Sequence, residues 1–422
     1  MSESWYGRSI EVRLGNPGHG GFCVARHEGR VVFVRHGLPG ELVRAEITED
    51  RGGSFCRADA VEIVEASPAR VTARCPISGP GGAGCCDFSH ATPDAQRAMK
   101  SSVVAEQLRR IAGVEREVEV EELPGTGDGT GWRTRLRLAV DPAGRAGFHG
   151  YRSSQVITDL LCPQPVLGTY QGLAERDWRP GGEIQVTVDG DGVRHVVEIE
   201  PAKVSSTGRR SPGRRGATAR RAAQAGPRRE HVVEGSGRAV ERVGGRSWEL
   251  SATGFWQAHR GAAQTYSTVV GEWAEAAPGS IAWDLYGGVG VFAAELADQV
   301  GPDGEVVSVE SGRGAVDDGR RALADLGQVH LRAARVEKVV GELPVPVGAV
   351  VLDPPRSGAG REVIEALAHA GPGRVIHIGC DPAAFGRDVG LYLAQGYRLE
   401  QVRAFDAFPM THHVECLALL VR

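Results

Sequence analysis

Hydrophobic and polar positions follow different patterns in different parts of the chain, and the clearest pattern lies in the last third. There, short and mostly apolar runs occupy 281–285, 306–309, 349–352 and 375–378, and each is followed by glycine or acidic residues. Runs of this length, separated by stretches long enough for a helix, are typical of buried parallel strands. We therefore expect residues 249–422 to form an α/β domain with a Rossmann-like, doubly wound sheet.

The first 66 residues show a second pattern, in which apolar and polar positions alternate over short segments. Glycine-rich turns separate these segments, which occupy 10–14, 21–26, 30–35, 41–47 and 56–64. Short alternating segments with tight turns predict a small closed β-barrel, similar to the oligonucleotide-binding fold. RNA contact is the functional interpretation of such a barrel, and a barrel without a ligand is the alternative.

The middle of the chain, residues 67–248, is predicted to be a β-rich domain. Arginine alternates with apolar residues over 133–140, as in a half-buried strand with one basic face. Arg133 and Arg135 are therefore candidate RNA contacts. An arginine-rich insertion at about 202–230 is expected to be disordered. Attraction to RNA phosphates and a merely tolerated insertion are both open interpretations of it.

Composition narrows the possible function classes only slightly. The formal net charge of −4 excludes a uniformly basic nucleic-acid binder but allows a local basic face. No run approaches the roughly 18 apolar residues of a membrane span, so we expect a cytoplasmic protein without a membrane partner. We also expect a monomer. Eight cysteines in 422 residues do not fit a secreted disulfide scaffold, and they favour metal-binding or catalytic roles.

A thiol and a carboxylate stand out near the end of the chain. Cys380 lies just after the 375–378 run, where ligands and catalytic side chains gather in an α/β sheet. Glu415 ends the segment Asp406-Ala-Phe-Pro-Met-Thr-His-His-Val-Glu415 and is a candidate proton acceptor. A lone cysteine at a strand end is otherwise a buried structural residue, so its neighbours decide between the two interpretations.

The ends of the other predicted strands supply those neighbours. Asp353 and Arg356 enclose two prolines, which fix a rigid strand terminus. Gly287 and Gly288 allow a sharp turn close to a ligand after the first strand of this part. Glu310 ends the following strand, at the position that binds ribose hydroxyls in nucleotide-binding folds.

In this order, Asp353-Pro-Pro-Arg356, Cys380-Asp-Pro382 and the segment from Asp406 to Glu415 resemble the RNA uracil-C5 methyltransferase family, and the resemblance extends over the whole chain. It implies S-adenosylmethionine as methyl donor and a thiolate that adds to C6 of uracil. It assigns Cys380 as nucleophile, Glu415 as general base, and Asp353 and Arg356 to positioning the base and the cofactor. The implied cofactor-binding residues are Gln257, Tyr286, Gly287, Gly288, Glu310 and Asp353.

Residues 1–66 also resemble the TRAM domain of RNA-modifying enzymes, and a cysteine loop follows them. In many family members four cysteines hold a [4Fe–4S] cluster. The corresponding thiols here are Cys75, Cys85, Cys86 and Cys162. The loop departs from the family pattern because Ala83 stands where a cysteine is expected, and the adjacent side chains of Cys85 and Cys86 tend to diverge. A cluster and a cluster-free loop are therefore both open.

The barrel and the cysteine loop favour ribosomal RNA, of the 23S type, as substrate, with methylation of a transfer-RNA uridine as the alternative. A catalytically weakened RNA-binding homologue is a further alternative. Asp381 motivates it, because this acid stands where the family commonly has asparagine and would raise the pKa of the neighbouring thiol. A methyltransferase of small molecules is disfavoured, because such chemistry needs neither the barrel nor a thiol–carboxylate pair.

Overall fold

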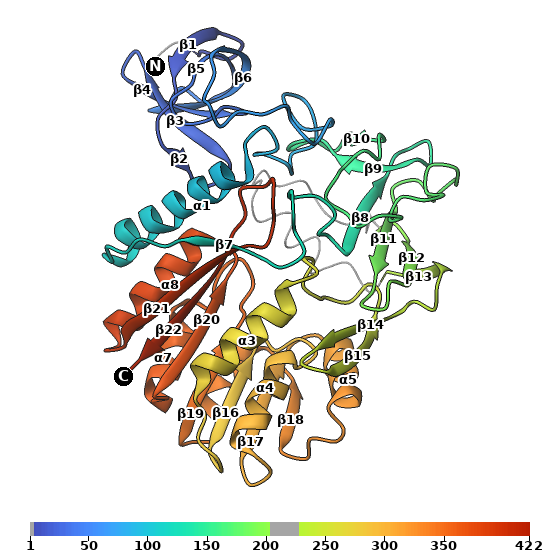
Figure 1. Ribbon diagram of the computed structural model, residues 1–422, viewed down its shortest axis with the longest axis vertical. Helices are drawn as coiled ribbons and strands as arrows, with labels where there is room; N and C mark the ends of the chain where they lie inside the picture. The colour runs from blue at the N-terminus through green and yellow to red at the C-terminus, as the bar shows by residue number, and fades with distance from the viewer. Residues whose placement is uncertain (1–3, 203–227) are drawn as a thin grey trace, which may run out of the picture.

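The computed structural model describes residues 4–202 and 228–422, so the predicted arginine-rich insertion lies almost entirely outside the described residues. Figure 1 shows three parts: a barrel at the N-terminus, a β-rich central part, and a C-terminal sheet with helices on both faces. The predicted α/β class, with a Rossmann-like domain preceded by a small barrel and a β-rich region, is confirmed.

The barrel is a six-stranded sheet in the order β1-β5-β6-β4-β3-β2. Its alternating sequence turns every second side chain inward, so that Ile10 and Val12 of β1 are buried while their neighbours are exposed. The strands are β1 (Ser9–Arg13), β2 (Pro17–Gly18), β3 (Phe22–His27), β4 (Arg30–Arg35), β5 (Leu42–Asp50) and β6 (Phe55–Glu65). The two-residue β2 forms within a glycine-rich stretch that the sequence pattern predicts as a turn.

The central part is built on a second six-stranded sheet, in the order β10-β9-β8-β11-β12-β13. Its strands are β8 (Arg135–Val140), β9 (Ala146–His149), β10 (Val156–Ile157), β11 (Glu183–Val188), β12 (Arg194–Ile199) and β13 (Glu230–Glu234). A hairpin of β14 (Arg238–Val243) and β15 (Arg246–Ser251) follows it. The buried Trp248 of this hairpin donates its indole N–H to the Val289 carbonyl at 3.1 Å, which joins the hairpin to the C-terminal part.

The C-terminal sheet has the strand order β18-β17-β16-β19-β20-β22-β21-β7. The first five of these strands run parallel, and β22 is antiparallel to both of its neighbours. The strands are β16 (Ile281–Leu285), β17 (Glu305–Glu310), β18 (Val329–Ala333), β19 (Val347–Leu352), β20 (Arg374–Gly379), β21 (Arg398–Asp406) and β22 (Glu415–Val421). The helical elements are α3 (Ala262–Ala274), α4 (Val291–Val300), α5 (Arg313–Ala322), α6 (Val336–Val339), η2 (Val340–Glu342), α7 (Gly360–Ala370) and α8 (Pro382–Ala394). Two apolar clusters, one for each face, hold the helices to the sheet.

The segment that follows the barrel completes this sheet from a distance along the chain. Helix α1 (Pro93–Gln107) continues into a π-helical turn, η1 (Leu108–Ala112), and β7 (Val120–Glu122) then pairs in parallel with β21. The fully buried Lys100 of α1 places its ammonium 2.5 Å from the Asp406 carboxylate at the end of β21. Among the described residues, no helix is long and apolar enough to cross a membrane.

Replacing Lys100 by methionine should lower the free energy of unfolding by about 3–5 kcal/mol, because the Asp406 carboxylate then stays buried without its partner. Urea unfolding monitored by tryptophan fluorescence measures the change. Arg97→Met on the same helix is the matched control, since Arg97 pairs with the largely exposed Asp94 and such pairs contribute about 0–1 kcal/mol. Equal unfolding midpoints for the two variants would contradict the prediction.

Candidate active site

The carboxyl ends of the parallel strands bring the predicted catalytic residues to one edge of the sheet. Asp353 directly follows β19, Cys380 directly follows β20, and Glu415 is the first residue of β22. Because β22 runs antiparallel to β20 with Gly379 opposite Cys416, Glu415 lies at the same end as Cys380. Two positions separated by 35 residues in sequence therefore lie on neighbouring strands, as a nucleophile–base pair requires.

Burial and charge set the protonation of this pair. Burial and the Glu415 carboxylate raise the pKa of the Cys380 thiol to about 12, and the Arg356 guanidinium acts in the opposite direction. Burial and the nearby Asp353 carboxylate raise the pKa of Glu415 well above its usual range. The thiol is partly exposed, the carboxylate is 4% exposed, and Arg356 is exposed to solvent beside them. A raised carboxyl pKa suits a group that accepts a proton near neutral pH.

Asp353 is the point where the thiol–carboxylate pair meets the predicted cofactor residues. Gln257 donates its side-chain amide to the Asp353 carboxylate at 3.4 Å. Burial raises the pKa of Asp353 to about 7, and its charge also raises the pKa of Cys380 and of Glu415. Asp353 thus connects Gln257, through a hydrogen bond, with Cys380 and Glu415, whose pKa values its charge raises.

The glycine turn after β16 forms the adjoining side of the site. A Cβ at Gly287 would lie 2.3 Å from Ser308 Oγ and 2.4 Å from the buried Asp284 carboxylate, so no larger residue fits. Gly288 has a positive φ with open space above its Cα, and its N–H donates to the Glu310 carboxylate at 3.3 Å. A turn with open space on its ligand side and an acid at the end of the next strand fits the nucleoside part of S-adenosylmethionine.

Tyr286 begins this turn in the left-handed region, with a φ of 60°. Its hydroxyl donates to Glu337 at 3.1 Å, from the helix that follows β18. No motif in the sequence singles out Glu337, which lies in the short helix α6. The structure nevertheless brings its carboxylate to the predicted cofactor residues.

The residue after the thiol makes contacts that sequence reasoning did not find. Asp381 caps α8 by accepting from the N–H groups of Ala383 and Ala384, at 3.1 and 2.9 Å. Its other oxygen lies 3.2 Å from His19 Nε2 in the barrel, and the contacts with His19 and the cap lower the pKa of Asp381 to about 2, against the opposing effect of burial. His19 stands between glycines with no local pattern, so only the folded chain shows that the barrel touches the turn of the thiol.

The cysteine loop gathers three thiols. The sulfur atoms of Cys75, Cys86 and Cys162 all lie within 4.8 Å of one another and are buried, which is the donor chemistry of a thiolate metal centre. Hydrogen bonds from Cys162 and Cys86 lower the pKa of Cys75. Cys85 is partly exposed, and the neighbouring Cys86 thiol lowers its pKa. Three of the four predicted ligands thus converge, and the fourth lies beside them.

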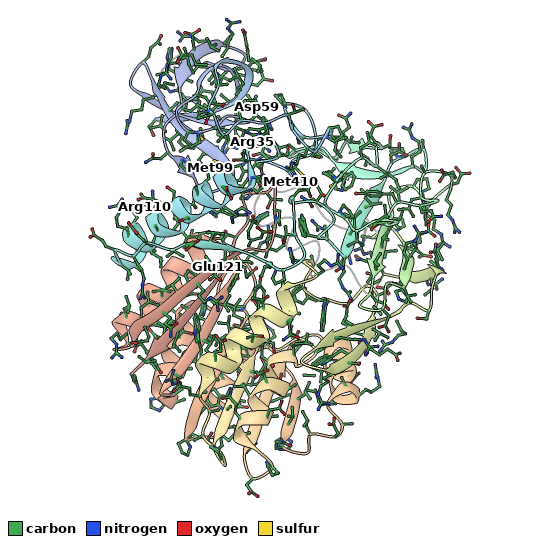
Figure 2. All side chains as sticks on the ribbon, viewed as in Figure 1. Arg35, Asp59, Met99, Arg110, Glu121 and Met410 are labelled. Carbon is green, nitrogen blue, oxygen red and sulfur yellow. The ribbon has the colours of Figure 1, made fainter. Side chains whose placement is uncertain are left out.

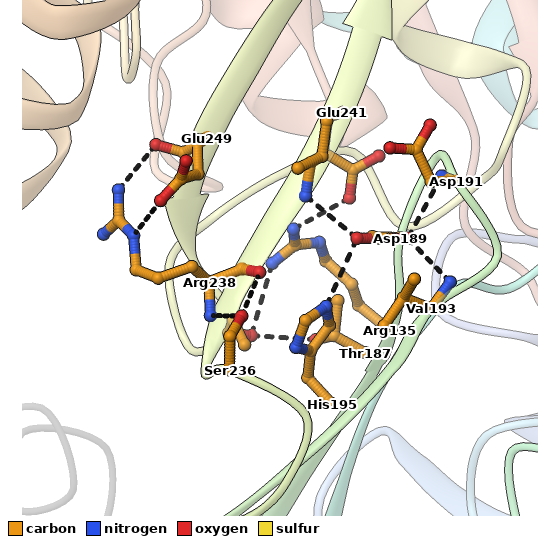
Figure 3. Close-up of polar contacts among 12 residues, drawn as sticks. Arg135, Thr187, Asp189, Asp191, Val193, His195, Ser236, Arg238, Glu241 and Glu249 are labelled. Atoms are coloured by element: carbon orange, nitrogen blue, oxygen red, sulfur yellow. Dashed lines mark hydrogen bonds and ion pairs between the residues drawn. The ribbon is translucent and has the colours of Figure 1, made fainter.

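The two arginines predicted to contact RNA lie in different surroundings. Arg135 is 6% exposed and pairs with the buried Glu241 at 2.9 Å, in the network of Figure 3 that also holds Thr187, Asp189 and His195. The predicted exposed basic face of β8 is therefore wrong at Arg135, because the β14–β15 hairpin covers it. Arg133 is half-buried and bonds the Gln164 side chain at 3.1 Å, beside the cysteine loop.

A doubly wound sheet with a glycine turn, an acid after its second strand and a thiol–carboxylate pair at the same edge defines the class of S-adenosylmethionine-dependent methyltransferases. Family comparisons specify the class further. Residues 4–61 match the TRAM domain, and residues 342–422 match the family described as tRNA (Uracil-5-)-methyltransferase.

Similar proteins span the whole chain. An uncharacterized RNA methyltransferase of Corynebacterium efficiens is 42% identical over 99% of this chain and 95% of its own length. The 23S rRNA (uracil(1939)-C(5))-methyltransferase RlmD of Alkalilimnicola ehrlichii is 31% identical over 98% of this chain and 96% of its own. The chain belongs to the family of S-adenosylmethionine-dependent RNA uracil-C5 methyltransferases.

The fold agrees with this assignment. The solved structure of the Pyrococcus abyssi tRNA (uracil-54, C5)-methyltransferase, in complex with S-adenosyl-L-homocysteine, superposes with a TM-score of 0.69. It covers 98% of this chain and 100% of its own, at 22% identity. The superposition shows the fold, and the family match together with the full-length relatives confirms the predicted enzyme class and methyl donor.

Proposed function

We propose that this enzyme methylates C5 of a uridine in ribosomal RNA through a covalent bond between Cys380 and C6 of the base. The observation that carries the proposal is the placement of Cys380 and Glu415 at the same end of the neighbouring strands β20 and β22. Ribosomal RNA is favoured over transfer RNA because the relative that acts on 23S rRNA is 31% identical over the full length, against 22% for the tRNA enzyme.

The chemistry explains why both residues are needed. Uracil C5 is a weak nucleophile. When the Cys380 thiolate adds to C6, the electrons of the C5–C6 double bond move into an enolate of O4, C4 and C5, whose carbon C5 can accept a methyl group. Glu415 then takes the proton from C5. The C–H electron pair restores the C5–C6 double bond, the C6–sulfur bond breaks, and Cys380 leaves as a thiolate. A buried uridine must leave its stack to reach the thiol.

S-adenosylmethionine supplies the methyl cation for this reaction when bound. We assign its nucleoside part to the turn of Tyr286, Gly287 and Gly288, with Glu310 at the ribose. Gln257 and Asp353 would hold its methionine part toward Cys380. Arg356 is the exposed cation beside the catalytic pair, and we assign it to holding the uridine, where its charge also favours the thiolate.

Two hollows beside the barrel support RNA binding in this region. A cavity of about 430 Å³ lies between the barrel and the central part, with Phe22, Phe33 and Tyr151 in its lining. A groove of about 1330 Å³ shares the same two phenylalanines and runs along α1 to η1, where its lining includes Arg110 and Arg109, the latter paired with Glu106 at 2.7 Å. Partly exposed aromatic rings stack bases, and guanidinium groups bind phosphates, so single-stranded RNA fits both hollows.

We also propose that Cys75, Cys85, Cys86 and Cys162 hold a [4Fe–4S] cluster. The convergence of three buried thiols supports a metal centre, and the adjacent Cys85 supplies a fourth sulfur. Iron and acid-labile sulfide analysis of anaerobically purified protein tests the proposal. Four irons and four sulfides per chain are expected. One zinc ion per chain and no sulfide would instead show that these cysteines form a single-metal site.

The experiment that tests the proposed function uses purified protein, methyl-labelled S-adenosylmethionine, and unmodified ribosomal and transfer RNA in separate reactions. We expect labelled 5-methyluridine from the ribosomal RNA after digestion. The same nucleoside from transfer RNA alone would move the substrate to that class. Label in another nucleoside would contradict the proposed methylation of uridine C5. RNA binding without label would favour the catalytically weakened homologue.

Methylation should lose rate as the pH falls, because the general base acts only when it is unprotonated. The pKa of Glu415 lies above the usual carboxyl range, so the loss should begin at a higher pH than for an ordinary glutamate. We expect single-turnover rates to decrease as the pH falls through about 7, the value to which burial raises the pKa of Asp353, with apparent pKa values that belong to the Glu415–Asp353 pair. A rate that stays constant down to about pH 5 would contradict the raised pKa.

A further inference from the structure

Asp87, the residue after Cys86, lies where the three parts of the protein meet. One of its oxygens is 2.6 Å from the Arg35 guanidinium of the barrel, and the other is 2.6 Å from His412 Nδ1. Gly21 of the barrel also packs on it so closely that a Cβ there would lie 2.8 Å from the Asp87 carboxyl carbon. The Asp87 side chain is 2% exposed, so both oxygens are committed to these partners.

His412 belongs to the loop between β21 and β22, which leads directly to Glu415. Other parts of the chain hold this loop in place. Lys100 donates to the Phe408 carbonyl at 3.0 Å, Gln96 accepts from the Met410 N–H at 2.7 Å, and the Phe88 N–H donates to the Met410 carbonyl at 2.9 Å. Figure 2 labels Met410 of this loop, Met99 of α1 and Arg35 of the barrel in the same region of the view.

The loop continues from His412 into the active site. The rings of His412 and His413 are 4.1 Å apart, and His413 also packs edge-on against Phe408. Burial, together with the charges of His412 and Arg356, lowers the pKa of His413 to about 3. The same Arg356 charge lowers the pKa of Glu415, two residues further on, so His413 and Glu415 share one cationic neighbour.

We propose that Asp87 is a positioning residue for the methyl transfer, acting through His412 to keep the loop, and with it Glu415, aligned for removal of the C5 proton. This inference rests on the proposed function. Because Asp87 directly follows Cys86 and binds Arg35, its hydrogen bond to His412 adds to the Phe88–Met410 contact and connects the packing of the cysteine loop and of the barrel to the segment before Glu415.

The test compares Asp87→Asn and His412→Leu with the wild-type enzyme on the same RNA. Misplacement of the base by about 1 Å costs on the order of 10²-fold in rate, so we expect kcat to fall by about that factor with little change in KM for RNA. Because the proton-removal step is the one that slows, the methylated covalent adduct with Cys380 should accumulate as an SDS-resistant protein–RNA band. The double variant should be no slower than the slower single variant, because both substitutions remove the same hydrogen bond between Asp87 and His412.

Asp189→Asn is the matched control. Asp189 is also a buried acid bonded to a histidine, at 3.2 Å from His195 Nε2, but it lies in the network of Figure 3 within the central part. We expect it to lower the melting temperature without raising the adduct fraction. If Asp87→Asn and His412→Leu lose activity only in proportion to lost folded protein, with no adduct, Asp87 has a structural role alone. Wild-type enzyme that yields neither 5-methyluridine nor an adduct with 5-fluorouridine RNA would instead overturn the proposed function.

Discussion

Replacing Cys380 by alanine should abolish methylation, lowering the rate by roughly 10³-fold or more, while RNA and S-adenosylmethionine still bind. The expected loss is large because C5 stays unreactive when no thiolate adds to C6, and removal of a nucleophile leaves only the effects of binding. Mass spectrometry of digested RNA measures 5-methyluridine, and filter binding measures RNA affinity.

Cys416→Ala is the matched control for this experiment. Cys416 is the other thiol at this end of the strands, and it is fully buried, so no base can reach it. This variant should retain activity within about tenfold of wild type, whereas Cys380→Ala should also fail to form an adduct with RNA containing 5-fluorouridine. The base can remove a proton from C5 but cannot remove fluorine in the same way, so the wild-type enzyme keeps its covalent bond to 5-fluorouridine. An adduct that survives Cys380→Ala but not Cys416→Ala would reassign the nucleophile.

Glu415→Gln should trap the enzyme halfway through the reaction on ordinary uridine. Glutamine matches glutamate in size but takes no proton, so the methylated adduct cannot expel Cys380 and turnover should fall roughly 10²–10⁴-fold. Labelled methyl groups should then migrate with the protein on a denaturing gel. The double variant Cys380→Ala/Glu415→Gln should lose the labelled band.

The variant Asp353→Asn distinguishes the role of the Asp353 carboxylate from that of Glu415. Asp353 accepts a hydrogen bond from Gln257, and its charge raises the pKa of Glu415. We assign Asp353 to binding the cofactor and not to removing the C5 proton. Its variant should therefore weaken S-adenosylmethionine binding and form little labelled adduct. Accumulation of adduct in Asp353→Asn, with normal turnover in Glu415→Gln, would transfer the role of base to Asp353.

Much of the site is visible in the sequence because short-range rules control it. The apolar runs predict β16, β17, β19 and β20, and residues that follow parallel strands meet at one edge of the sheet. The glycine turn is visible for the same reason, since the adjacent Gly287 and Gly288 closely follow an apolar run and allow a sharp turn there.

Contacts between distant segments could not be predicted in this way. Lys100 and Asp406 are 306 positions apart, and neither the helix pattern nor the strand pattern marks them as partners. Arg135 reads as a surface residue because strand alternation does not say that a later hairpin will cover one face with Glu241. The contact between His19 and Asp381 likewise depends on how the barrel docks, which no local periodicity encodes.

The pairing of β7 with β21 and the position of β22 have a consequence for biosynthesis. Residues 120–122 of β7 pair with β21 at 398–406, so β7 has no partner strand until those residues have been synthesised. The strand that begins with Glu415 comes later still and ends at residue 421. The barrel can fold as soon as it leaves the ribosome, because its strands all lie before residue 66. The barrel can therefore be folded during translation well before the ribosome has made the strand that carries Glu415, the base that we propose for the reaction.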